Sequence, residues 1–441
     1  MANQGRRTFL KLSGGVLGGV LAGSTVTAAE RTDRFIVKTR GNGAPSDLDV
    51  VFDLPEIGYA VVRGSESAVE ASSAVTSYAP DVELDGADPS VETHDYEGEA
   101  TDDALYPFQW DKQALDVPTA HETTKGEGTR VAVIDSGVDA SHPDLEVNTA
   151  VSKNLTGDGL GAGVPGGGDH GTHVAGTVAA QTTGETGVAG TAPATDLVDY
   201  RVFSNFGGVS GAFSIVIGAV VQAARDDCDV ANLSLGAYPI PRQGVTEGFY
   251  GNFINAAMTY ANKEGTLLVI SAGNDSADLQ HDGSLISLPN EGAQALSVAA
   301  TGPIGFGWGD DGVTAPPESP AFYTNYGTNA VDLAAPGGDA DLAAAAEEVP
   351  GWYYDLVLST VSVVTDIGED GTVATEPGYG WKAGTSMAAP NVAGAAALVK
   401  SANPDYNANQ VESALKRAAA VPEGYDKAYY GAGFLNVVDA L

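Results

Sequence analysis

Five short apolar runs, separated by segments with helical patterns, constrain the fold of this chain more than any other feature. Apolar residues fall on both faces of the strand predicted in each run, as they do in a strand whose two faces are both buried. Residues 210–225 and 384–400 have the composition of helices. This alternation is typical of a parallel sheet covered by helices, so we predict an α/β fold. The runs are residues 130–134, 196–203, 230–235, 266–270 and 295–299.

The acidic composition limits what the chain can bind. Its 441 residues include 58 Asp and Glu against 21 Lys and Arg, a formal net charge of −37. Nucleic acids and anionic membrane surfaces are bound by clustered Lys and Arg, so we expect neither as a partner. Self-repulsion of this size is tolerated where salt screens it, which predicts a surface adapted to high salt. The single cysteine, Cys228, excludes an intramolecular disulfide and a cysteine-based zinc site.

Residues 1–28 have the features of a targeting segment. Arg6, Arg7 and Lys11 precede a short, glycine-rich apolar stretch over residues 12–22, and small residues follow. That stretch is too short to span a membrane, and no other stretch is long and apolar enough, so we expect no membrane anchor. The paired arginines resemble a twin-arginine export signal, which predicts an extracellular protein.

Residues 29–103 are predicted to form a small unit followed by a linker. We expect strands over residues 34–38, 49–54, 57–62 and 82–84, and a helix over residues 65–77 after a serine cap. Residues 85–103 are acidic and rich in turn formers, which predicts an exposed linker. The remaining residues, 104–441, contain the apolar runs. Surface loops are expected at residues 238–252, 276–292, 302–320 and 338–355.

Four polar residues at strand ends and helix starts indicate nucleophilic catalysis. Asp135 ends the first apolar run, and His170 and Ser386 stand where helices are predicted to begin. A serine hydroxyl is a poor nucleophile unless an imidazole accepts its proton and a carboxylate orients that imidazole. Asn274 follows the run 266–270 and offers an amide donor for an oxyanion, beside the backbone N–H of Ser386. Each residue alone has an ordinary explanation as a turn, packing or capping residue, but together they predict a hydrolase.

Several motifs, in the same chain order, make residues 104–441 resemble the subtilisin-like serine proteases, or subtilases. The motifs are residues 133–137, 142–145, 170–176, 234–236, 272–274, 334–337 and 384–390. The resemblance implies a three-layer subtilisin-like α/β fold with a mostly parallel central sheet, preceded by a small α+β domain. It also implies a serine endopeptidase of broad specificity that cleaves proteins or peptides through an acyl-enzyme. The acidic composition and the leader are most similar to the secreted haloarchaeal members, the halolysins.

The resemblance implies a role for each matching residue. Ser386 is the nucleophile, His170 the general base and then acid, and Asp135 the residue that orients His170. Asn274 and the Ser386 amide form the oxyanion hole, and Pro390 is expected in the first turn of the helix that Ser386 begins. His173 is expected to be structural. The implied substrate-binding residues are Ser234, Leu235, Gly236, Gly207, Gly208 and Gly273.

The resemblance also suggests two further partners. Residues 29–103 are similar to the propeptide of the family, an intramolecular inhibitor, and self-cleavage is then expected at about residues 95–104. Asp144 matches a position that ligates calcium in several members, because calcium prefers carboxylate oxygens. The expected partner loop, residues 181–187, lacks the usual asparagines. Calcium therefore stays open, and the chemistry itself requires no cofactor.

Three other functions remain as alternatives. A non-catalytic secreted binding protein with the same fold would have no chemical need for the four polar residues. A dinucleotide-binding enzyme is disfavoured, because the turn after Asp135 lacks the Gly-x-Gly-x-x-Gly pattern. An esterase is disfavoured because Ser386 is not in a Gly-x-Ser-x-Gly motif.

Overall fold

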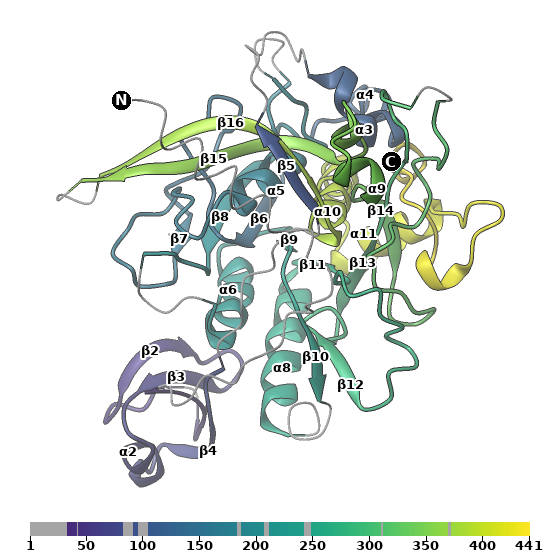
Figure 1. Cartoon of the computed structure of the whole chain (residues 1–441). Helices are drawn as coiled ribbons and strands as arrows, with labels where there is room; N and C mark the ends of the chain where they lie inside the picture. The colour runs from purple at the N-terminus through teal and green to yellow at the C-terminus, as the bar shows by residue number, and fades with distance from the viewer. Residues whose placement is uncertain are drawn as a thin grey trace.

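Within the part of the chain that the structure describes, a seven-stranded parallel sheet forms the centre of the larger domain (Figure 1). The computed structural model describes residues 33–41, 43–82, 91–95, 105–182, 187–206, 211–241, 248–309, 312–368 and 372–441. The strand order is β14-β13-β11-β9-β6-β8-β7, and all neighbouring pairs are parallel. The strands are β6 (Arg130–Asp135), β7 (Lys153–Asn154), β8 (Asp196–Arg201), β9 (Val230–Leu233), β11 (Leu267–Ser271), β13 (Ala295–Thr301) and β14 (Leu333–Pro336). The predicted α/β fold is confirmed.

Alternate residues of each strand serve the two faces of this sheet. Val131 and Val133 of β6 pack with α5 (His170–Ala179), α10 (Thr385–Ala402) and α11 (Ala408–Ala418). Ala132 and Ile134 pack on the other side with α6 (Phe213–Arg225) and α8 (Phe249–Glu264). Because side chains alternate along a strand, a run that is apolar throughout fills both layers. Short helices complete the domain: α3 (Trp110–Ala114), α4 (Val117–Ala120), α9 (Leu342–Ala346) and α12 (Val437–Ala440).

The described residues 33–82 form a small separate domain that packs beside α6 and α8 (Figure 1). It has an antiparallel sheet in the order β2-β3-β1-β4 and one helix, α2, whose N-cap Ser65 accepts a hydrogen bond from the backbone N–H of Ala68. Its elements are β1 (Arg34–Thr39), β2 (Asp49–Leu54), β3 (Tyr59–Arg63), α2 (Glu66–Ala71) and β4 (Val75–Pro80). An ion pair of 2.6 Å between Arg225 and Glu56 ties it to α6. The chain leaves it at Val82, whose carbonyl accepts from Phe213 N at 2.7 Å.

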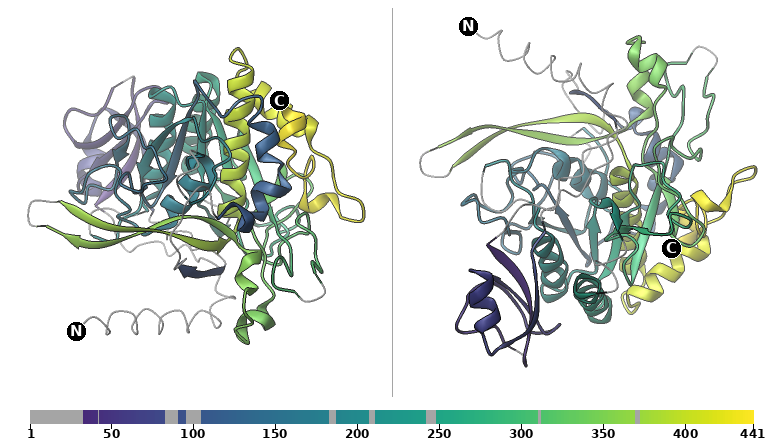
Figure 2. Two further views of the ribbon diagram at one scale, coloured as in Figure 1. Left: turned by 90° about the horizontal axis from the view of Figure 1, so that it is seen from above. Right: turned by 60° about the horizontal axis from the view of Figure 1, so that its bottom comes forward.

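A long hairpin, β15 (Val357–Ile367) and β16 (Val373–Ala383), extends beyond the body of the larger domain (Figure 2). Its inner half is buried and its outer half exposed. Backbone pairing joins β16 to β5 (Val91–Asp95), in antiparallel register from Gly380 opposite Asp95 to Ala383 opposite Val91. β16 leads directly into Gly384 and α10, so β5 runs away from Ser386. A segment of the N-terminal region therefore lies on the sheet edge next to the predicted nucleophile.

Several local predictions were wrong. The helix predicted over residues 65–77 ends at Ala71, and the following residues form β4, which the sheet recruits as an edge strand. Part of the linker predicted over residues 85–103 is the strand β5, while residues 83–90 and 96–104 lie outside the described residues. The loop predicted over residues 238–252 includes β10 (Ala237–Pro241), which pairs with β12 (Leu285–Leu288), and the first turn of α8. Tertiary pairing decided these elements, not local propensity.

The leader predicted at residues 1–28 also lies outside the described residues. Among the helices that the structure describes, none combines the length and the apolar character needed to cross a bilayer.

Two buried carboxyl groups organise the predicted loops around residues 302–320 and 338–355. Asp355 accepts hydrogen bonds from Gly305 N at 3.0 Å and Phe306 N at 2.7 Å, and from Trp308 Nε1 at 2.8 Å. Asp339 accepts from Ala340 N at 2.8 Å. Burial raises the pKa of Asp339 to about 7, and burial likewise raises the pKa of Asp355 to about 6. Both groups therefore hold a proton more firmly in the folded chain than in the unfolded one.

Asp339→Asn is expected to reduce the loss of stability between pH 5 and pH 8. A carboxyl whose pKa is raised on folding stabilises the fold fully below its unfolded pKa, and that contribution is lost as the pH rises through about 7. The amide imitates the protonated form, so the variant should gain on the order of 1 kcal/mol over the parent at pH 8. Thermal unfolding at several pH values measures this. Asp405→Asn, at an exposed position, is the control, and equal pH dependence of parent and Asp339→Asn would contradict the expectation.

Candidate active site

Asp135 and His170 meet at the carboxyl end of the central sheet. Asp135 is the last residue of β6, and His170 is the first residue of α5. The Nδ1 atom of His170 lies 2.8 Å from Oδ1 of Asp135, and both side chains are buried. Oδ1 of Asp135 also accepts from Ser136 N at 2.7 Å, which fixes the carboxylate. With its Nδ1 proton held by Asp135, the imidazole presents Nε2 as its free basic nitrogen.

Two glycines let the end of β6 approach the start of α5. Gly137 has a φ of 105°, and a Cβ there would lie 2.2 Å from the carbonyl oxygen of Val164. A Cβ on Gly171 would lie 2.6 Å from the carbonyl oxygen of Gly137. Any side chain at either position would push the two segments apart. The Asp135–His170 hydrogen bond thus depends on the sequence Asp-Ser-Gly and on the glycine that follows His170.

Ser386 is the second residue of α10, and a neighbouring serine compensates for Pro390 in the same helix. Pro390 is the sixth residue of α10, not in its first turn as predicted, so it cannot donate to the carbonyl of Ser386. Ser234 Oγ fills this gap and donates to Ser386 O at 2.7 Å. The hydroxyl of Ser386 donates to Ser234 O at 3.3 Å. The backbone of the predicted nucleophile is therefore fixed although a proline interrupts its helix.

The side-chain amide of Asn274 is oriented by Thr385. Its Oδ1 accepts from Thr385 N and from Thr385 Oγ1, both at 2.9 Å, so its Nδ2 is left to donate elsewhere. A Cβ placed on Gly384 would lie 3.4 Å from Asn274 Nδ2 and 3.6 Å from Ser386 N. The side-chain nitrogen of Asn274 and the backbone nitrogen of Ser386 therefore lie close to the same point, and their role as an oxyanion hole stays a prediction.

The electrostatic surroundings of His170 favour its charged form. Burial alone lowers the pKa of His170, but the Asp135 carboxylate opposes burial and the net pKa is raised. His170 Nε2 is buried and has no hydrogen-bond partner among the described residues. Hydrogen bonds between base and nucleophile are often formed only when substrate binds. The unbonded Nε2 is therefore the atom at which a base of this kind accepts a proton.

The predicted substrate-binding residues have mixed outcomes. Ser234, Leu235 and Gly236 follow β9, and the side chains of Ser234 and Leu235 are buried, so this segment offers its backbone. Gly273 has a φ of 100°, and the position of a Cβ is taken by Nδ2 of Asn325 at 2.4 Å. The turn and the close approach of Asn325 therefore explain why position 273 is a glycine. Contact between Gly273 and substrate stays a prediction. Gly207 and Gly208 lie outside the described residues.

Asp144 is fully buried and accepts hydrogen bonds from backbone N–H groups around it. Its Oδ2 accepts from Val188 N at 3.0 Å, and its carbonyl accepts from Gln181 N at 2.9 Å. In the part of the chain that the structure describes, no three His, Cys, Asp or Glu side chains gather to form a metal site. Residues 183–186 of the expected partner loop are not described. Ligation of calcium by Asp144 therefore stays a prediction.

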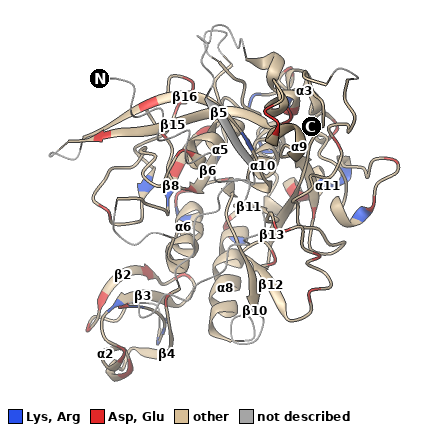
Figure 3. Ribbon diagram, viewed as in Figure 1, with Lys and Arg blue, Asp and Glu red and all other residues tan. Residues whose placement is uncertain are grey.

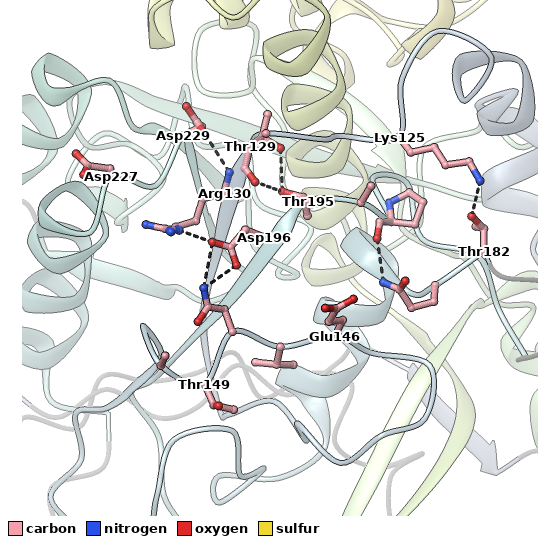
Figure 4. A pocket seen from close by; sticks show the side chains of 17 residues that line it. Lys125, Thr129, Arg130, Glu146, Thr149, Thr182, Thr195, Asp196, Asp227 and Asp229 are labelled. Carbon is pink, nitrogen blue, oxygen red and sulfur yellow. Dashed lines mark hydrogen bonds and ion pairs between the residues drawn. The ribbon is translucent and has the colours of Figure 1, made fainter.

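A hollow of about 1150 Å³ lies at the opposite end of the sheet (Figure 4). It is bordered by the first residues of β6 and β8, whereas His170 and Ser386 follow the carboxyl ends of the strands. Two of its charged groups are paired with each other: Arg130 Nε lies 2.7 Å from Asp196 Oδ2, and Asn148 Nδ2 lies 2.9 Å from Asp196 Oδ1. Because the hollow is at the end of the sheet away from His170 and Ser386, we assign it no catalytic role.

The two other residues singled out in the sequence are structural. His173 is buried in α5, and its Nε2 lies 3.1 Å from Val357 O of β15. Cys228 is buried, and burial raises the pKa of its thiol to about 12, so it is not a nucleophile at neutral pH.

Sequence reasoning missed residues that support the site from a distance. Thr385 orients Asn274, and Asn325 holds the turn at Gly273 by donating to Ala272 O at 3.0 Å. Lys382 of β16 forms an ion pair with Asp169, the residue before His170. Thr385 lies inside the motif at residues 384–390, so the sequence motif could have indicated its role. Asn325 and Lys382 carry no local signal, because only the fold brings them to the site.

A carboxylate-bound imidazole and a serine at a helix N-terminus, on a parallel α/β sheet, are the groups that a serine hydrolase uses. The comparisons give the family. The family model described as Subtilase family matches residues 126–433, so the chain belongs to the subtilases and is a subtilisin-like serine protease.

Relatives and solved structures agree with this assignment. Subtilisin Savinase of Lederbergia lenta is 32% identical over 332 residues, which cover 74% of this chain and 96% of that protein. The Extracellular protease of Xanthomonas campestris pv. campestris is 32% identical over 364 residues; the match covers 74% of this chain but only 53% of that protein. A protease structure from Pseudoalteromonas arctica has a TM-score of 0.59 at 29% identity and covers 78% of this chain and 98% of that chain. The Epidermin Leader Peptide Processing Serine Protease of Staphylococcus aureus, at 21% identity, covers 92% of this chain and 97% of that chain and supports the fold, with a TM-score of 0.68.

Proposed function

We propose that this chain is a secreted serine endopeptidase in which Ser386, His170 and Asp135 form the catalytic triad. The observation that carries the proposal is the 2.8 Å hydrogen bond between Asp135 and the buried His170, together with Ser386 in the first turn of α10, a helix that packs on α5. Ser386 Oγ attacks the peptide carbonyl carbon while its proton passes to His170 Nε2. Asn274 Nδ2 and Ser386 N donate to the resulting oxyanion.

The same groups complete hydrolysis. His170 gives its proton to the leaving amine, which departs and leaves an acyl-enzyme on Ser386. Water then loses a proton to His170 and attacks the ester, and the protonated His170 returns that proton to Ser386 Oγ as the acid product leaves. Asp135 stabilises the imidazolium that forms in each half of the reaction.

Substrate binding is proposed to use backbone edges. The segment 234–236 on one side and the edge of β16 on the other have backbone groups suited to an added strand. Backbone pairing reads no particular side chain, which favours broad specificity. Residues 29–103 are proposed to act as a propeptide, because β5 already lies on the β16 edge.

Labelling with a serine-directed fluorophosphonate tests the triad. The intact protein should gain one adduct, and peptide mass mapping should place it on Ser386. Peptide hydrolysis should be lost in parallel with labelling. Cleavage that survives complete labelling, or an adduct on another residue, would overturn the assignment.

Export and adaptation to high salt form the second part of the proposal. The acidic side chains are spread over the small domain, the hairpin and the loops of the larger domain rather than gathered at one site (Figure 3). Such a distribution suits a halolysin-type enzyme exported through the twin-arginine pathway. We also retain calcium at Asp144 as a proposal. A chelator that leaves the thermal midpoint unchanged would count against it.

Folding is expected to depend on salt. At about 0.1 M salt the Debye length is about 10 Å, so the −37 net charge repels itself across the molecule, whereas at about 1 M it is near 3 Å. The thermal midpoint should therefore rise between these two KCl concentrations. An equal osmolality of sucrose serves as the control, because it does not screen charge. An unchanged midpoint would remove the salt proposal and leave the protease assignment intact.

A further inference from the structure

A buried lysine lies among the residues that position the proposed general base. Lys382 of β16 is only 2% exposed, and its Nζ lies 3.1 Å from Oδ2 of Asp169. Burial of an ammonium group costs free energy and is tolerated when a carboxylate pairs with it. In a chain with so few basic residues, a cation at this buried position needs an explanation beyond solubility.

Asp169 uses its carboxylate in an unusual way. It occupies the N-cap position of α5, where an aspartate commonly accepts a hydrogen bond from the first turn, yet its side chain makes no capping bond. The carboxylate pairs with Lys382 instead. Asp169 directly precedes His170, and Lys382 lies four residues before Ser386. The ion pair thus joins the two segments that carry the proposed base and nucleophile.

The charged groups around His170 come from several elements. From β6, Asp135 bonds to Nδ1, and Arg201 of β8 stands opposite Asp135 in the sheet register. From α5 itself come Asp169 and the neighbouring His173, and from β16 comes Lys382. The remaining charged residues of the described elements packed on α5 or β6 are Asp196 and Asp199 of β8, Arg130 of β6, Arg225 of α6, Asp366 of β15, Glu376 of β16 and Lys400 of α10. Asp199 is buried, and burial is the main reason that its pKa is raised, with Asp135 adding to the effect. The other residues lie toward the remote ends of their elements.

The nearby charges act on His170 in opposite directions. After burial, which lowers its pKa, the Asp135 carboxylate is the strongest influence and raises it. Lys382 lowers the pKa of His170, and Asp169 raises it. Lys382 lowers the pKa of His173 as well, in addition to the effect of burial. Lys382 is therefore the cation that counteracts Asp135 at this imidazole.

We propose that Lys382, held in place by Asp169, is a positioning residue that keeps His170 neutral at a lower pH than Asp135 alone would allow. This inference rests on the proposed function, because the neutral imidazole is the form that accepts the Ser386 proton. The remote carboxylates of this acidic chain all favour a protonated His170, but molar salt screens them. A buried charge is screened much less, so Lys382 retains its effect in salt.

The acidic limb of the pH profile of kcat/KM tests this proposal at low and at molar KCl. Lys382→Met removes the cation, so the limb should move to higher pH by about 1 unit, which is about a tenfold loss on the acidic side. Asp169→Asn removes the opposing anion and should move the limb to lower pH. The shift caused by Lys382→Met should remain in molar salt. Lys263→Met is the matched control, because that lysine is 77% exposed and lies on α8.

Two further measurements separate this inference from the proposed function. Fluorophosphonate labelling of Ser386 in each variant gives the concentration of intact sites, so that damage to the fold is not mistaken for a shift of the limb. Lys382→Arg keeps the charge and should restore the parental limb. If Lys382→Met does not fold, the proposal is tested by the position of the acidic limb in Asp169→Asn and in Lys382→Arg.

The possible results differ clearly. If Ser386 is labelled but the limb stays in place in the charge-removing variants, or moves the same way in both, the proposal for Lys382 is wrong and the triad stands. If the parent itself is not labelled at Ser386, the proposed function fails first.

Discussion

Ser386→Ala is expected to abolish peptide hydrolysis and to leave the chain at full length in a pure culture. Without the hydroxyl no acyl-enzyme can form, and the oxyanion donors alone supply little catalysis. The expected loss in kcat is about a millionfold, the size known for the nucleophile of subtilisin, which this family includes. Intact mass and N-terminal sequencing measure processing, and a peptide substrate measures turnover.

The control for this variant is Ser413→Ala. Ser413 lies on the exposed side of α11 and donates only to Asn409 O. This variant should be processed and active like the parent. A correctly processed Ser386→Ala chain would contradict self-cleavage, and residual turnover close to that of the parent would contradict the nucleophile.

Asn274→Ala is expected to lower kcat by about 100- to 1,000-fold while KM changes little, the range known for such a donor in subtilisins. The amide of Asn274 contributes most when the carbonyl oxygen becomes an oxyanion, because the donor is already oriented by Thr385. Stopped-flow or steady-state hydrolysis of an ester and a peptide substrate measures both constants.

A matched control for Asn274→Ala is Asn262→Ala. Asn262 lies on the surface of α8 and donates to Asn409 Oδ1, far from the sheet end that carries the site. It should leave both constants unchanged. If the loss in Asn274→Ala appeared in KM alone, the side chain would bind the ground state and would not be an oxyanion donor.

The sequence was most informative where burial and local chemistry agree. The run at residues 130–134 is apolar on both faces because β6 lies between two helical layers, and this alone predicted its place in a parallel sheet. The helix starts at His170 and near Ser386 were predicted because polar residues there interrupt apolar patterns. The sequence predicted that Asp135 orients His170. The geometry of their hydrogen bond depends on the close approach of the chain at Gly137 and Gly171.

Non-local pairing explains what the sequence did not reveal. β5 is polar and short, and nothing in Val91–Asp95 indicates a strand until β16 offers an edge. Pro390 was expected in a first turn because a helix interior rarely tolerates proline. The Ser234 hydroxyl, 152 positions before Ser386 in the chain, supplies the donor that the Ser386 carbonyl loses to this proline. The Lys382–Asp169 pair also joins residues that are distant in sequence.

If residues 29–103 act as the proposed propeptide, the pairing of β5 with β16 separates peptide cleavage from the onset of activity. Its ladder with Gly380–Ala383 consists of backbone pairing, which does not disappear when a bond elsewhere in the chain is cut. The small domain is held independently, by the Arg225–Glu56 ion pair and by Val82 at the start of α6. On that proposal, a freshly processed molecule still carries β5 on the edge proposed to bind substrate. Progress curves should then begin with a lag that reports the dissociation of β5, and a cell that secretes the enzyme would gain time before the enzyme acts on the cell's own surface.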